Sequence, residues 1–364
     1  ERARVTAIGA PMGVIAGIIP VTNPTSTALF KSLAAVKSGN AVVHAPHPRA
    51  ARCTLRAAEI MADAAVSAGA PEGLISCLTA PTLAATQELM RRPEIALVLA
   101  TGGPGMVRAA YSSGKPTIAV GAGNVPTYVG ASVPDPAEAA EMILTSKAFD
   151  NGTACVAEQS VVVAEAVAPA FFAAFEARGA HWLNGPQQEH LARVLFDERG
   201  GLRPDAVGQS APRLAEMAGF TVPTATRVLA AELTSVGPDV PLSREILGPV
   251  LSVYRVRDAA AGRARCREVL ALGGEGHTCG VHAADPAEIA PFATLPASRI
   301  LINTPALFGG MGYSAEVDPS FQLGTGTWSG SICSDNVTPL HLINIKRVAH
   351  EVRPWRTVYD AVEL

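Results

Sequence analysis

The sequence contains little charge and no long apolar run. Of its 364 residues, 17% are charged and 48% are hydrophobic, a balance that fits two compact domains and excludes a disordered or fibrous chain. The longest apolar stretch, Val14–Ile19, is too short to cross a bilayer and is bracketed by Pro11 and Pro20. No signal peptide is visible either. We therefore expect no membrane partner.

Cysteine pairs and basic clusters are also missing. The six cysteines, at positions 53, 77, 155, 266, 279 and 333, form no CxxC pair and have no His-rich group beside them. This spacing argues against a disulfide framework and against a metal site, and it fits a reducing cytoplasm. The net charge is −3 and the Lys and Arg residues are scattered, so the sequence offers no footprint for nucleic acid. We expect a small-molecule partner.

The first part of the chain alternates apolar strands with longer periodic helices, which is typical of a parallel sheet with crossover helices. We expect strands at 14–19, 41–44, 74–78, 95–100 and 117–120. Helices are expected at 24–36, 49–68, 82–90, 104–112 and 136–149. The pattern predicts an α/β fold with a Rossmann-type dinucleotide-binding domain over residues 1–150.

The rhythm continues less regularly after residue 150. We expect a strand at 159–163, helices at 167–178 and 215–218, and an apolar run at 250–253. These elements predict a second α/β domain over residues 151–340. The remaining stretch, 341–364, mixes a helical segment with a polar tail. We expect it to pack back on the first domain or on a partner subunit.

Cys155 lies in a turn of small residues that follows a helical run and precedes an apolar strand at 160–163. A thiol held on such a turn acts as a nucleophile when neighbouring backbone N–H groups stabilise the oxyanion that it creates. The alternative is a buried structural cysteine.

Two glycine turns end strands of the first domain: Thr101-Gly102-Gly103-Pro104-Gly105 and Gly121-Ala122-Gly123-Asn124. The first opens a helix, where free backbone N–H groups can hold a phosphate. The second lets a flat ring approach the backbone closely. Each turn alone is also consistent with ordinary turn chemistry, since the spacing is not a GxGxxG fingerprint. Together they favour a dinucleotide.

Asn23 ends the first strand of the sheet and precedes a helix. Its amide can donate a hydrogen bond to a developing negative oxygen, although a helix N-cap is an equally good interpretation. An amide donor, a thiol on a turn and a dinucleotide site together imply covalent aldehyde chemistry. The thiolate adds to the aldehyde, and loss of hydride to a nicotinamide leaves a thioester on Cys155.

Several motifs resemble the aldehyde dehydrogenase superfamily, and more narrowly its CoA-acylating branch, which includes the aldehyde dehydrogenase half of bifunctional aldehyde-alcohol dehydrogenases. The resemblance covers nearly the whole chain in the same order. The motifs are residues 11–20, 23–27, 100–105, 149–152, 245–250, 276–278, 302–305 and 326–330.

The resemblance implies roles for particular residues. Cys155 would be the nucleophile and Asn23 the oxyanion donor, while His277 would assist proton transfer or thiol activation unless it is a surface histidine. Glu245 would hydrogen-bond the nicotinamide ribose unless it is a solvated loop charge. The cofactor-binding residues implied are Ile19, Pro20, Val21, Thr22, Thr101, Gly102, Gly103, Gly121, Ala122, Gly123, Glu245 and Leu247, with Pro46 and His47 at the adenosine end.

The same resemblance implies the substrates and the assembly. NAD is the expected cofactor, with NADP left open, and coenzyme A is the expected co-substrate beside an aldehyde. Leu307, Phe308 and Met311 are candidate pocket residues that suggest a short-chain aldehyde, unless they are core packing. Superfamily members are dimers or tetramers, so a homo-oligomer is implied. Packaging in a bacterial microcompartment stays open because it depends on terminal peptides.

The chain also departs from the hydrolytic members of the superfamily. Val120 falls where those enzymes hold their water-activating glutamate, and a valine cannot deprotonate water. Ala45 falls where they carry a lysine that contacts the cofactor ribose. Because the chain opens with Glu1, we expect the family's N-terminal helical segment to be missing. Nothing after His350 resembles an iron-dependent alcohol dehydrogenase, so we expect a stand-alone enzyme.

These departures favour a CoA-acylating aldehyde dehydrogenase. Two alternatives remain: a hydrolytic NAD(P)-dependent enzyme whose water is activated by some group other than Val120, and a truncated relative that keeps the fold but has lost catalysis.

Overall fold

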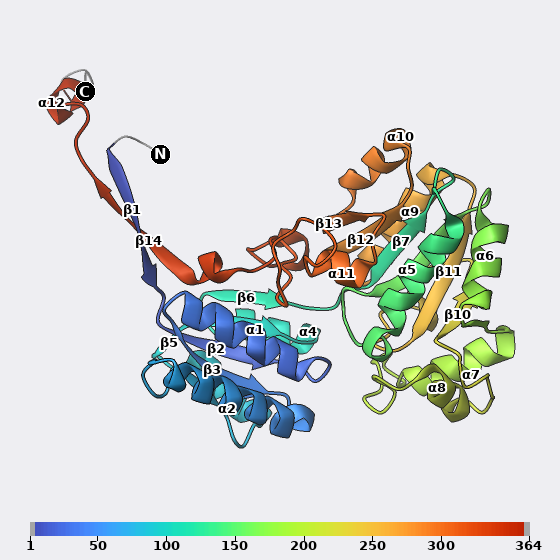
Figure 1. Ribbon diagram of the computed structural model, residues 1–364, viewed down its shortest axis with the longest axis horizontal. Helices are drawn as coiled ribbons and strands as arrows, with labels where there is room; N and C mark the ends of the chain where they lie inside the picture. Colours follow the sequence, from blue (N-terminus) through green and yellow to red (C-terminus); the bar gives the residue numbers. More distant parts are fainter. Residues whose placement is uncertain (1–3, 360–364) are drawn as a thin grey trace.

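The computed structural model describes residues 4–359, and its strands form three sheets (Figure 1). A parallel five-stranded sheet has the order β4-β3-β2-β5-β6, and a parallel seven-stranded sheet has the order β13-β12-β7-β8-β11-β10-β9. The strands of the five-stranded sheet are β2 (Val14–Ile19), β3 (Ala41–Pro46), β4 (Ile75–Cys77), β5 (Ile95–Thr101) and β6 (Thr117–Val120). Those of the seven-stranded sheet are β7 (Val125–Val129), β8 (Glu158–Ala164), β9 (Ala180–Trp182), β10 (Val228–Glu232), β11 (Val250–Val256), β12 (Gly276–His282) and β13 (Ala297–Ile302).

Helices cover both faces of the five-stranded sheet, so its strands are apolar on both sides. Ile15 of β2 packs in a core with residues of α1 (Pro24–Lys37) and α2 (Ala51–Ser67). The next residue, Ala16, faces the opposite core, which includes residues of α3 (Leu83–Arg91) and α4 (Pro104–Tyr111). The alternation of side chains along a strand places successive residues in different cores.

The seven-stranded sheet is covered in the same way. One core contains Val161 and residues of α5 (Pro136–Ala148) and α6 (Ala168–Ala177). The core on the other face contains Val162 and residues of α9 (Ala259–Ala271). A third core joins α7 (Gly185–Leu195) and α8 (Ala211–Met217) to the sheet at β10 and β11.

The expected α/β fold with parallel sheets is confirmed, and each expected strand and helix of the first 150 residues has a counterpart within a few residues. The change of sheet does not fall at residue 150, however. β7 and α5 precede that position and belong to the seven-stranded sheet, so the chain passes between the sheets at residues 121–124. The sequence analysis missed β7 because its five residues follow a glycine turn and carry no alternating pattern.

The two sheets meet end to end, at the ends of their strands. The carboxyl ends of β2, β3, β5 and β6 point toward the side from which β7, β8, β11 and β12 start. Ligands of parallel α/β sheets bind beyond the carboxyl ends of the strands, so the junction is where the fold places a site.

The last part of the chain contains a strand that the sequence did not predict. Leu342 is buried in the core of the five-stranded sheet, but the chain then forms a strand, β14 (Ile343–Ala349), rather than continuing as a helix. β14 pairs antiparallel with β1 (Val5–Pro11), and this two-stranded ribbon projects away from the sheets (Figure 1). The short helix α12 (Trp355–Tyr359) follows, and residues 360–364 of the expected tail lie outside the described part.

Asn40 fastens this C-terminal segment to the sheet. Its fully buried amide accepts a hydrogen bond from the backbone N–H of Gly13 at 2.8 Å and donates one to the carbonyl of Leu342 at 2.8 Å. The bonds lie at the amino edge of the five-stranded sheet, the opposite end from the carboxyl edge described above. Over residues 4–359, no helix is long and apolar enough to cross a bilayer.

Candidate active site

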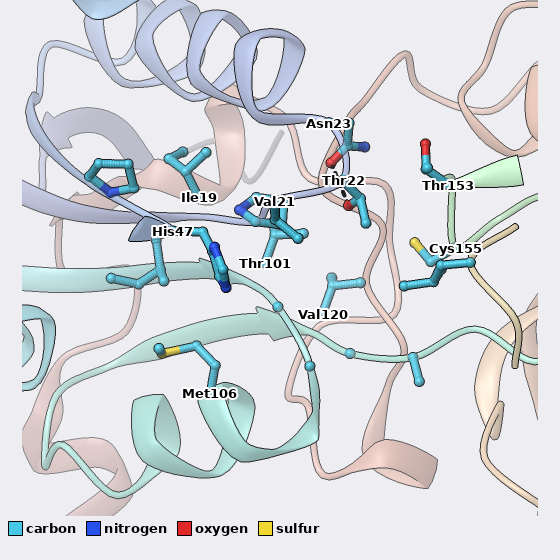
Figure 2. Close-up of a pocket in the computed structure, with 18 of the residues that line it drawn as sticks. Ile19, Val21, Thr22, Asn23, His47, Thr101, Met106, Val120, Thr153 and Cys155 are labelled. Carbon is cyan, nitrogen blue, oxygen red and sulfur yellow. Dashed lines mark hydrogen bonds between the residues drawn. The ribbon is translucent and has the colours of Figure 1, made fainter. Parts of the chain in front are cut away.

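A cavity of about 490 Å³ lies at the junction of the two sheets, a size typical of small-molecule sites. Figure 2 shows side chains from both sheets around it. Of the catalytic and cofactor-binding residues expected from the sequence, all except Gly123 and His277 line the cavity. Residues that had been scattered over more than two hundred positions are therefore brought to one place, although their chemical roles stay predictions.

Cys155 is half-buried and lines the cavity, so it is not a buried structural cysteine. It precedes β8 in a turn where Asp150 and Asn151 have positive φ angles of 48° and 51°. Gly152 has φ of 70°, and a Cβ atom there would lie 2.5 Å from the carbonyl oxygen of Gly248. The turn that carries Cys155 thus lies directly against the loop that carries Glu245, and only glycine permits that contact.

Asn23 occupies the N-cap position of α1, yet its side chain makes no capping hydrogen bond. Its Oδ1 instead accepts from the hydroxyls of Thr22 at 3.3 Å and Thr27 at 3.2 Å. The amide nitrogen is left to donate elsewhere. Figure 2 shows this nitrogen on the side where Cys155 lies, with the sulfur of Cys155 directed toward Asn23. The arrangement favours the oxyanion interpretation over the N-cap interpretation.

Glu245 is not a solvated loop charge. Its carboxylate is half-buried in the cavity wall and accepts a hydrogen bond of 2.7 Å from the backbone N–H of Gly123. Burial raises the pKa of Glu245, while the Gly123 bond and the Lys147 charge oppose that rise. Among the described residues that line the cavity, it is the one carboxylate.

The thiol of Cys155 experiences opposing electrostatic influences. Burial raises its pKa to about 12, and the charge of Glu245 acts in the same direction. The guanidinium of Arg299 and the backbone N–H groups of Cys155 and Val156 lower it. Arg299 is itself buried and donates to the carbonyls of His277 at 3.1 Å and Gly324 at 2.9 Å. A buried positive charge and a half-buried negative charge therefore act on the Cys155 thiol in opposite directions.

His277 is fully buried on β12, so the surface interpretation is wrong. Burial lowers its pKa to about 3, and the imidazole is therefore neutral. Its Nδ1 contacts the Thr278 hydroxyl at 3.0 Å, while Nε2 has no protein partner among the described residues. A Cβ atom on Gly123 would lie 2.9 Å from the ring and would also overlap the carbonyl oxygen of Cys155. The ring is thus close to the nucleophile's backbone but outside the cavity lining.

The remaining walls are apolar. Val120 and Ala45 both line the cavity. These are the positions at which the resemblance places the glutamate and the lysine of the hydrolytic members. Met311 also lines it, whereas Leu307 and Phe308 belong to the core behind the wall. No lysine or arginine occurs among the described residues of the lining.

Sequence reasoning missed part of the lining. Thr82, Leu83 and Thr86 surround the start of α3, beyond the carboxyl end of β4, and the edge rule for parallel sheets could have located them. Phe321 and Leu323 come from an irregular loop that has no periodic pattern, so the sequence carried no signal for them.

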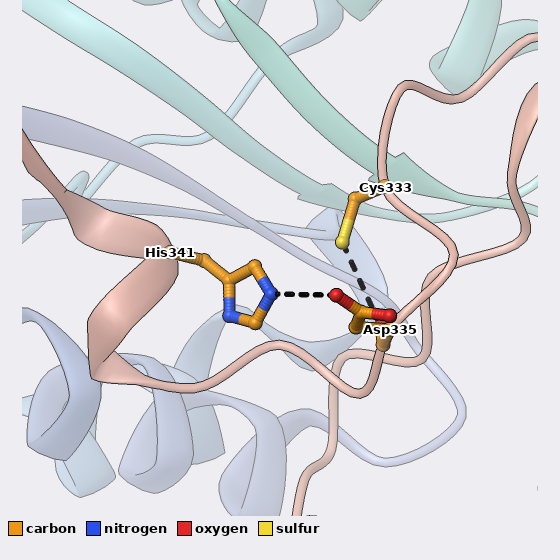
Figure 3. A group of neighbouring side chains, drawn as sticks. All are labelled: Cys333, Asp335 and His341. Carbon is orange, nitrogen blue, oxygen red and sulfur yellow. Dashed lines mark hydrogen bonds and ion pairs between the residues drawn. The ribbon is translucent and has the colours of Figure 1, made fainter. Parts of the chain in front are cut away.

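One group outside the cavity brings three potential metal ligands together: Cys333, Asp335 and His341 (Figure 3). The imidazole Nδ1 of His341 accepts the backbone N–H of Thr338 at 3.0 Å. Its Nε2 must then carry the proton, which it directs to Asp335 at 3.3 Å. A protonated nitrogen cannot ligate a metal, so the arrangement is that of a hydrogen-bonded pair.

Replacing the carboxylate beside the thiol should change its reactivity. Because a thiolate is repelled by a neighbouring anion, Glu245→Gln should lower the pKa of Cys155 and accelerate its alkylation at pH 8 several-fold. Iodoacetamide labelling of Cys155, followed by peptide mass spectrometry over a pH series, measures this. Glu216→Gln, an exposed change on α8, is the control. An unchanged or higher thiol pKa in Glu245→Gln contradicts the electrostatic account.

Comparisons with known proteins agree with this geometry. The model of the aldehyde dehydrogenase family matches residues 1–194. The bifunctional aldehyde-alcohol dehydrogenase AdhE of Escherichia coli K12 is 45% identical over 94% of this chain, but the chain spans only 39% of that relative.

Two solved structures are also similar. An acetylating aldehyde dehydrogenase from Geobacillus thermoglucosidasius has a TM-score of 0.94 and 47% identity, covering 96% of this chain and 77% of its own. A Rhodopseudomonas palustris propionaldehyde dehydrogenase with bound CoA and an acylated cysteine has a TM-score of 0.87 and 27% identity, covering 95% and 77%. Because both its sequence and its fold match these proteins, the chain belongs to the aldehyde dehydrogenase family.

Proposed function

We propose that this chain oxidises an aldehyde with NAD and transfers the acyl group to coenzyme A, giving acyl-CoA and NADH in a reversible reaction. One observation supports this most strongly. Cys155 shares its cavity with Val120 where a water-activating carboxylate would be needed for hydrolysis. The resemblance to AdhE and to acylating enzymes supports the same conclusion.

The first step belongs to Cys155 and Asn23. The thiolate attacks the carbonyl carbon, and the resulting oxyanion receives hydrogen bonds from the Asn23 amide and the Cys155 backbone N–H. The hydroxyls of Thr22 and Thr27 hold the Asn23 oxygen, which keeps its nitrogen turned toward the reacting atoms. His277, neutral and near the Cys155 backbone, is the candidate to move the proton.

The dinucleotide site is formed by the carboxyl edge of the five-stranded sheet. NAD, when bound, supplies the hydride acceptor. Gly103, the N-cap residue of α4, offers its backbone N–H to phosphate, whereas the Gly102 N–H already donates to the carbonyl of Val120 at 3.2 Å. We propose NAD over NADP because the lining has no lysine or arginine for a further phosphate. Arg49, close to His47, donates to the Pro204 carbonyl at 2.9 Å instead.

Apolar surroundings determine the fate of the thioester. Val120 is almost fully buried and cannot deprotonate water. A thiol is a stronger nucleophile than water toward the thioester, so the acyl group passes to the sulfur of CoA. The Cys155 sulfur leaves as the thiolate, and the proton that the CoA thiol loses restores the Cys155 thiol.

Glu245 supports a second candidate function. It is a carboxylate in the same cavity, and its charge acts on Cys155. If it activated water, the enzyme would hydrolyse the thioester and release a carboxylic acid. Its hydrogen bond with the Gly123 N–H favours a holding role instead.

The proposed substrate is an uncharged short-chain aldehyde. Met311 and Leu323 line the cavity with apolar surface, and among the described residues of its wall the one fixed charge is negative. An aldehyde carrying a carboxylate or sulfonate would find no cation there and would be repelled by Glu245. All six cysteines are free, which supports a reducing compartment; packaging in a shell is outside this proposal.

The first test follows NADH with propionaldehyde, with and without CoA, and with succinic semialdehyde as an anionic comparison. NADH formation should require CoA beyond one turnover, should be slower with the anionic aldehyde and should vanish in Cys155→Ala. Propionate formation without CoA at a comparable rate contradicts the acylating assignment. Loss of that propionate in Glu245→Gln would then identify the hydrolytic alternative.

The second test concerns the oxyanion. Asn23→Ala should lower kcat by about 10²–10³-fold because one preorganised donor is lost. Ser26→Ala is the matched control, since the Ser26 hydroxyl touches only the Asn23 backbone oxygen, at 3.2 Å. Stopped-flow measurement of NADH formation compares them. Full activity in Asn23→Ala removes this residue from the mechanism.

The third test concerns assembly. Ile8 of β1 and Val348 of β14 are exposed on the projecting ribbon, and we propose that a second copy of this chain covers them. Analytical ultracentrifugation should therefore give a dimer or larger species, and Ile8→Asp with Val348→Asp should shift it toward monomer. A monomer at micromolar concentration contradicts this.

A further inference from the structure

The backbone of Ile246, the residue after Glu245, is held by two buried side chains that do not line the cavity. The amide of Gln159 donates to the carbonyl of Ile246 at 2.7 Å and accepts from its backbone N–H at 2.8 Å. The amine of Lys147 donates to the same carbonyl at 3.1 Å. Ile246 is therefore hydrogen-bonded at both ends of its backbone, while its neighbours Glu245 and Leu247 face the cavity.

Both holding residues belong to the segment that carries the nucleophile. Lys147 lies in the last turn of α5 and Gln159 lies in β8, on either side of Cys155. Gly152, between them, is in close contact with Gly248. The segments 147–159 and 245–248 are thus joined at three points, and these contacts fix the distance between Glu245 and Cys155.

The hydrogen bonds of Gln159 and Lys147 to Ile246 are not a by-product of some stronger interaction of either side chain. Lys147 is fully buried, and burial lowers its pKa to about 7 although the charges of Glu158 and Glu245 oppose this. Within residues 4–359 it forms no ion pair with Glu158 inside 4 Å. Glu158 accepts the Ala306 backbone N–H at 2.8 Å instead. A buried amine and a buried amide are costly unless their hydrogen bonds are made, and here those bonds go to Ile246.

The position of Glu245 matters to the nucleophile. Its carboxylate bonds to Gly123, and its charge acts on the Cys155 thiol against that of Arg299. Coulomb energy depends on distance in a weakly screened site, so a loop free to move would change the reactivity of the thiol. The Gly123 bond fixes one end of the carboxylate, and the Ile246 peptide fixes the backbone from which it extends.

We propose that Gln159 and Lys147 are positioning residues that hold the Ile246 peptide and thereby keep the Glu245 carboxylate at a set place beside the Cys155 thiol. The consequence for cofactor binding rests on the proposed function, in which Glu245 holds the nicotinamide ribose. The consequence for the thiol does not, because it is measured without cofactor or substrate.

The test uses the full chain with Gln159→Met and, separately, Lys147→Met, which remove the hydrogen bonds; Met keeps the length of Gln159 and is about one atom shorter than Lys147. Cys155 alkylation by iodoacetamide is followed by peptide mass spectrometry over a pH series, and exposed Cys53 is the internal reference. Each variant should accelerate Cys155 alkylation at pH 8 several-fold, as Glu245→Gln does. Adding Glu245→Gln to either variant should give no further acceleration, because the same charge is already displaced.

Asn40→Leu is the matched control. It also removes a buried amide that accepts from one backbone N–H and donates to one backbone carbonyl. Asn40, however, lies at the amino ends of the strands of the five-stranded sheet, away from the cavity. Asn40→Leu should lower the melting temperature as the other variants do and leave Cys155 alkylation unchanged. In the CoA-dependent assay, Gln159→Met should lower kcat/KM for NAD by about 10- to 100-fold, with Asn40→Leu near the wild-type value.

Two outcomes overturn the proposal. One is unchanged Cys155 alkylation in both folded variants. The other is an acceleration of Cys155 alkylation that adds to that of Glu245→Gln, because Gln159 or Lys147 would then act on the thiol through a group other than Glu245. If the variants shift alkylation as expected but the wild-type enzyme does not acylate CoA, the positioning role stands and the proposed function fails.

Discussion

The site depends on one constraint: the carboxyl ends of the strands of one sheet face the amino ends of the strands of the other. The five-stranded sheet ends where the seven-stranded sheet begins, so each functional group reaches the cavity from a short turn. Asn23 follows β2, Cys155 precedes β8 and Glu245 precedes β11. Because β8 and β11 are hydrogen-bonded neighbours in one sheet, their pairing also holds the Cys155 and Glu245 turns relative to one another, and Asn23 faces both from the other sheet across the cavity.

The electrostatic surroundings of the thiol fit the storage of an acyl group. Burial and Glu245 disfavour the thiolate, whereas an acylated sulfur carries no charge and meets no repulsion. A thiol of high pKa is also a poor leaving group, so its thioester is less readily split. In the proposed mechanism, Val120 stands in place of a base, and the pocket therefore protects the intermediate from water until another thiol arrives.

The sequence predicted the elements of the first half well, because strands such as β2 are apolar runs closed by glycine or proline signals. It predicted the cavity residues through motifs at strand ends, which topology brings together. It could not show that Asn23 leaves its N-cap role, because that depends on the hydroxyls of Thr22 and Thr27. Nor could it reveal Gln159 and Lys147, whose partner is a backbone peptide about 90 positions away.

The most direct test of the central claim is the lifetime of the acyl-enzyme. Mixing the protein with NAD and propionaldehyde in the absence of CoA should give an intact mass increased by one propionyl group, located on Cys155. The adduct should persist well beyond one turnover and disappear when CoA is added. An unmodified protein accompanied by stoichiometric propionate would contradict the account, because it would place a working water-splitting group in the pocket.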